Sequence, residues 1–189
     1  AAPQADMRIA IGADGRIASL APVGAPATGP RRLALPALSN AHDHGRTFRS
    51  ATLGAYDKPL ESWIPFLGAV PGMDPYLCAA TSFARSVRHG VANLMVHYTR
   101  VQGGMPFVDE ARAVARAARD VGVRIGFAVA MRDRHGIGYD DDAAVLQALR
   151  PGIRDAVAGR LSAKAVAPGD QVRQVDDVAR MLEEGGLTD

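Results

Sequence analysis

The sequence predicts an α/β fold built around a parallel sheet. Apolar segments of strand length at 32–41, 91–98 and 123–131 alternate with amphipathic segments of helical length. Strands that are apolar throughout are typical of a covered parallel sheet, and strand–helix alternation predicts right-handed crossovers. A closed eight-stranded barrel needs about 200 residues or more. In a chain of 189 residues, these units therefore predict either a small open sheet or the first part of a barrel.

Residues 7–21 precede the sheet and predict a β-hairpin. Apolar and small or polar residues alternate on both sides of an Asp14-Gly15 turn. Residues 22–32 are rich in Pro, Gly and Ala and are typical of a linker. Residues 46–73, after the first long strand, form an irregular connection that contains several aromatic residues. Connections of this length are usually functional or disordered, and the aromatic residues argue against disorder.

The helix after this connection has clear signals at both ends. Asp74 is a candidate N-cap, Pro75 suits the first turn, and Gly90 follows the last turn. The apolar stripe that we expect to face the sheet comprises Leu77, Ala80, Ala84 and Val87.

Further helices are predicted in the second half of the chain. Residues 106–121 carry acidic residues early, a basic residue late and Gly122 at the end, as the helix dipole favours. Residues 140–149 predict a helix that stops at the Pro-Gly pair 151–152. Residues 172–184 predict another.

Composition narrows the class of protein. Hydrophobic residues make up 48% and charged residues 22%, with a formal net charge of +2 and basic residues mostly scattered. This balance is that of an ordinary globular protein and does not predict a nucleic-acid groove. No apolar run reaches the roughly 18 residues of a membrane span, and no signal peptide is visible. The single cysteine, Cys78, excludes an internal disulfide, predicts a core thiol and favours a cytoplasmic location.

His42 and His44 are the main candidates for chemistry. They lie one residue apart at the end of the first long strand, in the segment AHDHG. If the strand continues through them, both side chains point to the same side and Asp43 points away. The C-terminal ends of parallel strands carry the chemistry in α/β folds, and imidazoles suit zinc, iron or nickel. The alternative is a pair of ordinary polar residues at a strand-to-loop transition.

The segment LPALSNAHDH, residues 35–44, resembles the first barrel strand of the amidohydrolase superfamily, which reads approximately Pro-Gly-Leu-x-Asn-x-His-x-His. The hairpin segment ADGRIASLAP resembles the small β-sandwich that precedes the barrel in that superfamily. PLESWI and the strand–helix spacing resemble its deaminase and chlorohydrolase branch, which includes cytosine, guanine and triazine hydrolases. The resemblance covers about residues 7–150. Ala37 and Ser62 depart from it, since the family has Gly and several relatives have Glu there.

The resemblance implies an incomplete (β/α)8 TIM barrel. Residues 1–32 would be part of the β-sandwich and a linker, and 33–189 the N-terminal part of a metal-dependent hydrolase barrel with about three β/α units. His42 and His44 would bind one divalent metal ion, with zinc favoured over iron. The implied reaction on a small-molecule substrate is hydrolysis of a non-peptide C–N bond. A metal-activated water would most simply deaminate a cyclic amidine or heterocyclic amine.

The remaining ligands of the family lie on later strands. Relatives use histidines on the fifth and sixth strands, an aspartate on the eighth, and a glutamate for proton transfer. This chain has no histidine after His135, so we expect it to lack a complete active site by itself and its catalytic acid or base stays unknown. Two alternatives are a truncated, non-catalytic copy whose open sheet edge could form a homo-oligomer, and a small α/β binding domain.

Other residues are candidates for substrate binding. His97 ends the second strand and either contacts substrate or is a hydrogen-bonded rim residue. Trp63 and its aromatic loop would line a pocket. Arg132 follows the third strand, where it could bind an anionic or carbonyl group or form ion pairs with neighbouring aspartates. His89 lies in the last turn of a helix, where a favourable interaction with the helix dipole is expected.

Overall fold

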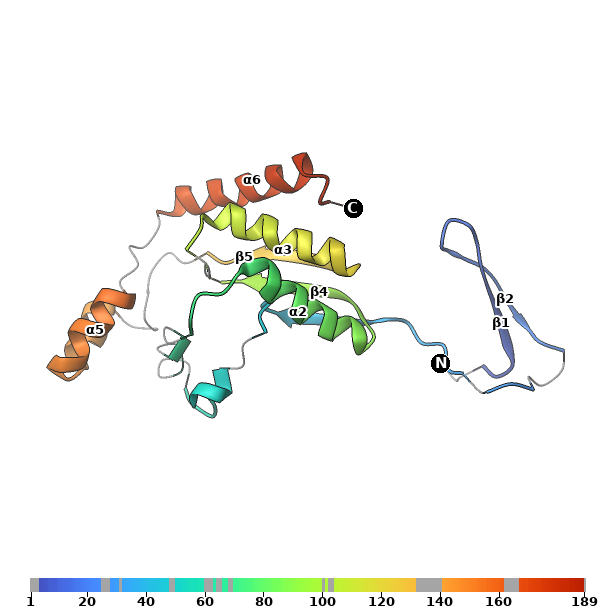
Figure 1. Cartoon of the computed structure of the whole chain (residues 1–189), viewed down its shortest axis with the longest axis horizontal. Coiled ribbons are helices and arrows are strands. Elements are labelled where there is room, and N and C mark those ends of the chain that lie inside the picture. Colours follow the sequence, from blue (N-terminus) through green and yellow to red (C-terminus); the bar gives the residue numbers. More distant parts are fainter. Residues whose placement is uncertain are drawn as a thin grey trace. The chain divides into compact units, whose positions relative to one another are not determined.

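The computed structural model describes residues 4–24, 28–30, 32–47, 50–59, 63, 66–67, 70–99, 101, 104–131, 141–161 and 167–188. The chain divides into two compact units, Ala1–Pro36 and Ala37–Asp189. Each unit is described by itself. The elements in chain order are β1 (Met7–Ile11), β2 (Ile17–Pro22), β3 (Leu38–Asp43), the 3-10 helix η1 (Ser50–Leu53), α2 (Pro75–Arg88), β4 (Val91–Tyr98), α3 (Phe107–Val121), β5 (Arg124–Val129), α4 (Asp142–Ala148), α5 (Pro151–Leu161) and α6 (Pro168–Glu184), as in Figure 1.

The first unit contains the predicted hairpin. β1 and β2 pair antiparallel, with Ile9 opposite Leu20 and Ile11 opposite Ile17. Gly15 adopts a φ of 75°, the left-handed conformation that the turn requires. Because residues directly opposite each other share a face, these four apolar side chains lie on one face of the hairpin, where all are exposed.

The second unit is built on a three-stranded parallel sheet in the order β3-β4-β5. β4 lies in the middle and pairs with both neighbours over most of its length. Its side chains alternate in burial, as a pleated strand requires. Leu94, Val96 and Tyr98 are buried, whereas Asn93, Met95 and His97 are partly or largely exposed.

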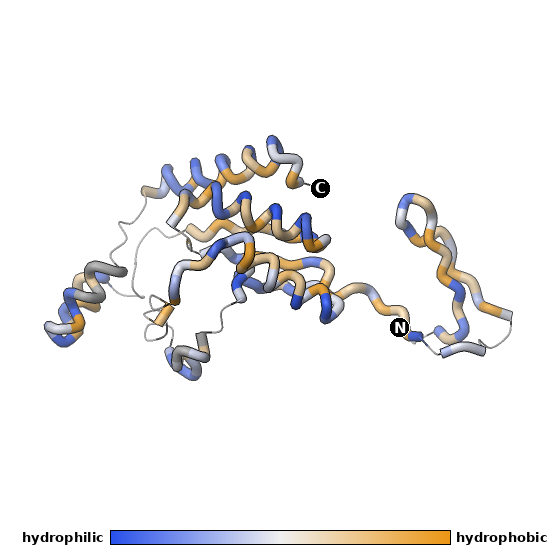
Figure 2. Tube along the Cα trace, in the orientation of Figure 1, coloured by the Kyte–Doolittle hydropathy of each residue, from blue (hydrophilic) through white to orange (hydrophobic). Residues whose placement is uncertain are grey.

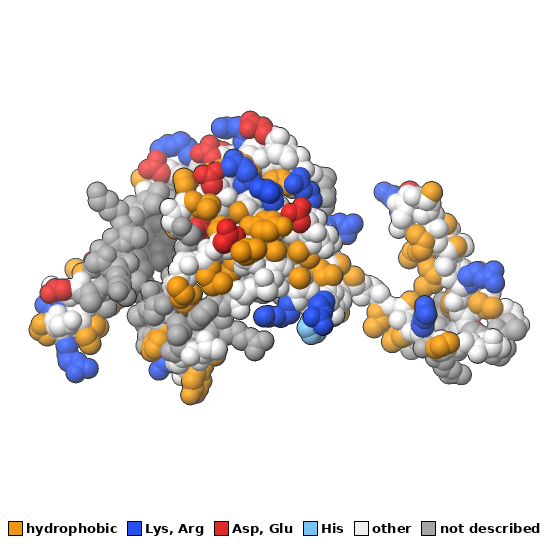
Figure 3. All heavy atoms as spheres, viewed as in Figure 1, with side chains coloured by type: hydrophobic (Ala, Val, Ile, Leu, Met, Phe, Trp, Pro, Cys, Tyr) orange, Lys and Arg blue, Asp and Glu red, His pale blue; other side chains and the backbone are white. Residues whose placement is uncertain are grey.

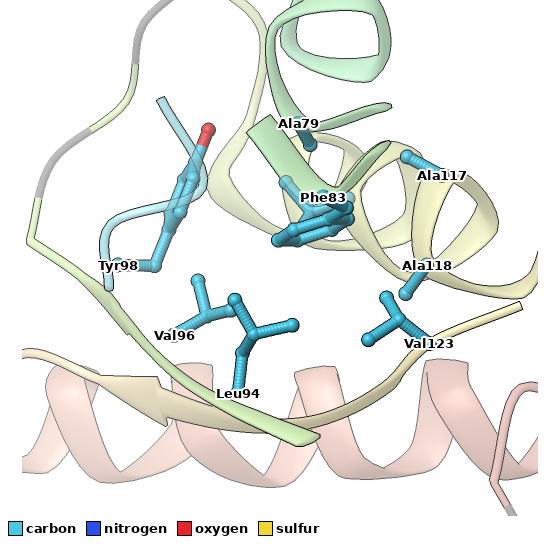
Figure 4. Close-up of a cluster of buried hydrophobic side chains, with 9 residues drawn as sticks. Ala79, Phe83, Leu94, Val96, Tyr98, Ala117, Ala118 and Val123 are labelled. Carbon is cyan, nitrogen blue, oxygen red and sulfur yellow. The ribbon is translucent and has the colours of Figure 1, made fainter. Parts of the chain in front are cut away.

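Helices α2 and α3 cover the face that the buried side chains share. Figure 4 shows this core, in which Phe83 from α2 lies among side chains from β4 and α3. The cluster comprises Ala79, Phe83, Leu94, Val96, Tyr98, Val114, Ala117, Ala118 and Val123. α6 packs against α3 through Val178 and Met181. Figure 2 shows the hydrophilic turns of α6 directed away from α3.

The predicted TIM-barrel class is wrong for this structure. The described residues form a three-stranded open sheet and a separate two-stranded antiparallel sheet, without barrel closure. The alternation of buried strands and helices correctly predicts the parallel pairing of the three strands. It does not determine whether a sheet of this size curves into a barrel, because the same pattern precedes both open and closed sheets. The alternative of a small open sheet describes the second unit.

The predicted apolar stripe of α2 meets the core only at Ala80, which is partly buried against it. Leu77 and Val87, from the expected stripe, are 63% and 38% exposed. The residues that face the core are instead Cys78, Ala79, Ser82 and Phe83. Figure 3 shows apolar side chains gathered on a visible face of the second unit among charged ones. Phe83 is fully buried, and its aromatic ring adds a large apolar area to the core on this face of the helix.

The helix predicted at 140–149 does end before Pro151, because α4 stops at Ala148, but the sequence did not predict that α5 begins at this proline. Proline is tolerated in the first helical turn, where its missing N–H would have no partner. The guanidinium of Arg154 donates to the carbonyl oxygens of Leu146 and Leu149 at 2.9 and 3.1 Å. It thus caps the end of α4 from the next helix. Within the described residues, no helix is both long enough and apolar enough to span a membrane.

Candidate metal-binding site

The end of β3 is held by a local hydrogen-bond network. The amide of Asn40 donates to Asp43 at 3.0 Å, and its carbonyl oxygen accepts the backbone N–H of His42 at 3.1 Å. The second carboxylate oxygen of Asp43 accepts the backbone N–H of Gly45 at 2.7 Å. One oxygen of Asp43 therefore holds the Asn40 side chain and the other holds the backbone after His44.

Gly45 completes the turn that follows His44. Its φ is 61°, and it is buried. A Cβ atom at this position would meet Phe83 and Val96 at 3.5 Å. A residue with a side chain would therefore be strained by its backbone conformation while filling the contact between the strand end and the core.

The imidazoles of His42 and His44 converge. Their Nε2 atoms lie 3.3 Å apart, and the rings meet edge to face with centroids 5.0 Å apart. Two nitrogens at tetrahedral positions on a zinc ion, each about 2.0–2.1 Å from the metal, are separated by about 3.3–3.4 Å. The separation of the two Nε2 atoms therefore fits one metal ion bound between them.

His97 of β4 orients both histidines. Its backbone carbonyl accepts a hydrogen bond from Nδ1 of His44 at 2.8 Å. Its ring stacks on His42, with centroids 4.3 Å apart and planes 20° apart. A carbonyl oxygen can only accept, so Nδ1 of His44 carries the proton and Nε2 presents its lone pair. This is how a backbone carbonyl commonly fixes a histidine that binds a metal through its other nitrogen.

The pair could also be joined without a metal. In that case, Nε2 of His42 would carry a proton and donate it to the lone pair of His44 across 3.3 Å. The distance of 3.3 Å is long for a hydrogen bond but compatible with one, so the geometry fits a bound metal ion as well as a direct bond. Among the described residues, no group of three or more His, Cys, Asp and Glu side chains is arranged to hold a metal ion. Here the donor set therefore consists of His42 and His44.

The positions of the other candidate residues do not test their expected roles. Trp63 donates its indole N–H to the carbonyl of Ala55 at 3.1 Å. It lines an open pocket with residues 55–59, and the histidines are not among the residues that line it. Arg132 lies outside the described residues. The substrate-binding roles expected for Trp63, His97 and Arg132 stay predictions.

Two residues have the structural roles expected for them. Nδ1 of His89 donates to the carbonyl of Arg85 at 2.7 Å, which caps the end of α2. Cys78 is buried in α2, and its sulfur lies 3.5 Å from the hydroxyl of Thr47.

Sequence reasoning missed the contributions of Gly45 and of the His97 carbonyl. The glycine directly after the second histidine was a visible signal, since glycine marks positions where the chain turns sharply or packs closely. The carbonyl has no sequence signal, because any residue at position 97 would supply one. No protein-family model, curated protein or solved structure matches the chain.

Proposed function

We propose that the chain belongs to a metal-dependent hydrolase in which His42 and His44 bind one divalent ion, zinc rather than iron. The observation that carries this proposal is the 3.3 Å separation of the two Nε2 atoms. The hydrogen bond from His44 to the carbonyl of His97 leaves Nε2 of His44 available as a ligand. Nitrogen ligands at this spacing suit zinc and disfavour magnesium and calcium.

The proposed reaction is hydrolysis of a non-peptide C–N bond, most simply the deamination of a cyclic amidine or heterocyclic amine. The basis for this reaction is the resemblance of residues 35–44 to the amidohydrolase strand. When bound, zinc supplies a water of lowered pKa for attack on an electrophilic carbon at neutral pH. In this chain, His42 and His44 would hold the ion, and the His97 ring would keep His42 in place beside the substrate.

Zinc binding is tested by equilibrium dialysis of the chain, followed by measurement of bound metal. We expect about one zinc per chain at a saturating zinc concentration, and expect His42→Ala and His44→Ala each to abolish this uptake. His89→Ala is the matched control, since it removes a histidine that caps α2 outside the cluster. Unchanged zinc content in both site variants would refute the proposal.

Hydrolysis is tested separately, with the protein encoded by the full reading frame that contains this chain. Ammonia release is measured over a panel of cyclic amidines and heterocyclic amines. We expect His44→Ala to abolish the release and His89→Ala to preserve it. If zinc binds through the pair but no compound is hydrolysed, the metal site stands and the reaction is rejected.

A second candidate is a non-catalytic domain that associates with its own copies. It is favoured by the three-stranded sheet, because β3 and β5 each pair with only one strand among the described residues. Strand edges of this kind tend to pair with other chains. Analytical ultracentrifugation without metal tests this function. A concentration-dependent dimer that takes up no zinc would favour the binding domain over the hydrolase.

We also propose a cytoplasmic location. The proposal rests on the single cysteine, which is buried, and which suits a reducing compartment. Cell fractionation with an antibody against the chain tests it, and recovery in an extracytoplasmic fraction would contradict it.

A further inference from the structure

A buried tyrosine–glutamate pair lies next to the histidine cluster. The hydroxyl of Tyr98, at the end of β4, donates to a carboxylate oxygen of Glu110 at 2.5 Å. Glu110 belongs to the first turn of α3, and both residues are fully buried. Burying a carboxylate is costly unless hydrogen bonds compensate, and an apolar pair of similar volume would avoid that cost. Packing alone therefore does not explain the choice of these residues.

The pair is connected to the site through the backbone of β4. Tyr98 directly follows His97, whose carbonyl accepts the hydrogen bond from Nδ1 of His44. The guanidinium carbon of Arg46, two residues after His44, lies 5.4 Å from the centroid of the Tyr98 ring. Both segments that form the site, the end of β4 and the turn after β3, thus contact Tyr98. Figure 4 shows the Tyr98 ring at one end of the core cluster.

We propose that Tyr98 and Glu110 are positioning residues that fix the orientation of His44. A hydrogen bond is directional and weakens steeply when its angle changes. The bond to Glu110 anchors the end of β4 to α3, so the carbonyl of His97 keeps its direction toward Nδ1 of His44. α3 thereby determines which nitrogen of His44 carries the proton. The consequence for zinc affinity rests on the proposed function, whereas the consequence for the proton does not.

The proton on His44 is observed directly by long-range proton–nitrogen NMR of the metal-free chain. We expect the wild-type His44 to hold its proton on Nδ1. In the double variant Tyr98→Phe/Glu110→Met, we expect the proton to distribute over both ring nitrogens. The double variant removes the hydroxyl and the carboxylate together, so neither is left buried without the other, and circular dichroism checks that the variant folds.

Three further variants separate positioning from stability. Glu110→Gln keeps an oxygen that can accept the Tyr98 hydroxyl, and we expect it to retain the proton on Nδ1. Tyr76→Phe removes another tyrosine–carboxylate hydrogen bond to α3, the exposed one from Tyr76 of α2 to Asp120. This variant should have no effect on the proton of His44. Val123→Ala weakens the core at the end of the cluster opposite Tyr98 (Figure 4) and should also leave His44 unchanged.

Zinc affinity supplies a second readout. We expect the double variant to bind zinc about tenfold more weakly than the wild type, at the lower end of what the hydrogen-bond partners of ligating histidines contribute. Glu110→Gln and Tyr76→Phe should bind within about twofold of the wild type on the same scale.

The outcomes distinguish the two proposals. If the wild-type chain binds no zinc but the double variant shifts the proton of His44, the metal proposal fails and the positioning role stands. If zinc binds and the double variant changes neither the proton nor the affinity, the positioning role is overturned. It is also overturned if Val123→Ala shifts the proton as much as the double variant does, because loss of stability would then explain the effect.

Discussion

The two faces of β4 differ in what they contribute. Leu94, Val96 and Tyr98 face α2 and α3 and are at most 2% exposed. On the other face, Asn93 and His97 are partly exposed, and Met95 is 41% exposed. The strand therefore stabilises the fold with one set of alternate residues and presents the histidine cluster with the other.

This separation has a physical consequence for substitutions. Residues on the helix-covered face lose apolar contacts and leave cavities when they are shortened, so their replacement costs stability. Residues on the open face border solvent and lose little when they are replaced. His42, which stacks on His97, should therefore affect metal binding far more than folding.

The largest expected effect comes from adjacent residues on opposite faces of β4. Leu94→Ala should lower the free energy of unfolding by about 2–5 kcal/mol, because it leaves a cavity beneath α2 and α3. Met95→Ala should lower it by less than about 1 kcal/mol, because that side chain is largely exposed. Urea unfolding followed by circular dichroism measures both. Equal losses would show that the open face is covered in solution and would break the comparison.

The second prediction concerns zinc as a stabilising ligand. An ion that binds only the folded chain stabilises it by about 2.7 kcal/mol at a free concentration 100 times its Kd. Thermal unfolding should therefore shift upward with zinc in the wild type and stay unchanged in His44→Ala. The shift should survive in His89→Ala. A shift of similar size in His44→Ala would indicate zinc binding elsewhere on the chain.

Local signals predicted much of the fold. The strand at 91–98 matches β4 in both bounds, and Asp74 caps α2 by accepting the backbone N–H of Leu77 at 2.8 Å. Gly122 ends α3 with a φ of 79°. These features depend on neighbouring residues only, so periodicity and capping chemistry suffice to find them.

Features that depend on tertiary contacts were not predictable in the same way. The buried face of α2 depends on what Phe83 meets on the sheet, and the end of α4 is capped by Arg154 from the next helix. Whether the sheet stays open or closes into a barrel depends on the number of strands and on the curvature of the sheet. No local sequence pattern encodes either property. Tertiary packing overrides local preference in each case.

The same limit applies to the candidate site. The sequence predicted that His42 and His44 point to one side, because both lie near the end of one strand. It did not predict the carbonyl that fixes His44, which comes from a residue 53 positions away in the chain. It likewise did not single out Glu110, since an acidic residue in the first turn of a helix has an ordinary explanation in the helix dipole.

A smaller loss of stability is expected from replacing Gly122, the residue that ends α3. Gly122→Ala should cost about 1–2 kcal/mol, because a residue with a Cβ atom is strained in the left-handed conformation. Gly152→Ala is the matched control. Gly152 lies in α5 without a positive φ, and a Cβ atom there would meet only open space, so alanine at this position should be neutral or slightly stabilising. Urea unfolding of both variants measures the difference, and equal effects would contradict the conformational explanation.

The smallest expected effect is the pH dependence of the pair between Tyr76 and Asp120 on the helix surface. The hydrogen bond to Asp120 raises the pKa of Tyr76 above its ordinary value of 10.0, with smaller contributions from burial and from the Asp120 charge. A raised pKa in the folded state means that the stabilisation is present below about pH 10 and is lost as the pH rises through the folded pKa. The melting temperatures of wild type and Tyr76→Phe should therefore converge above about pH 10.

Because the pair is exposed to solvent, the difference at neutral pH should be small and should shrink in high salt. A difference that persists unchanged at high pH would show that packing of the ring, and not the hydrogen bond, links α2 to α3 at this point.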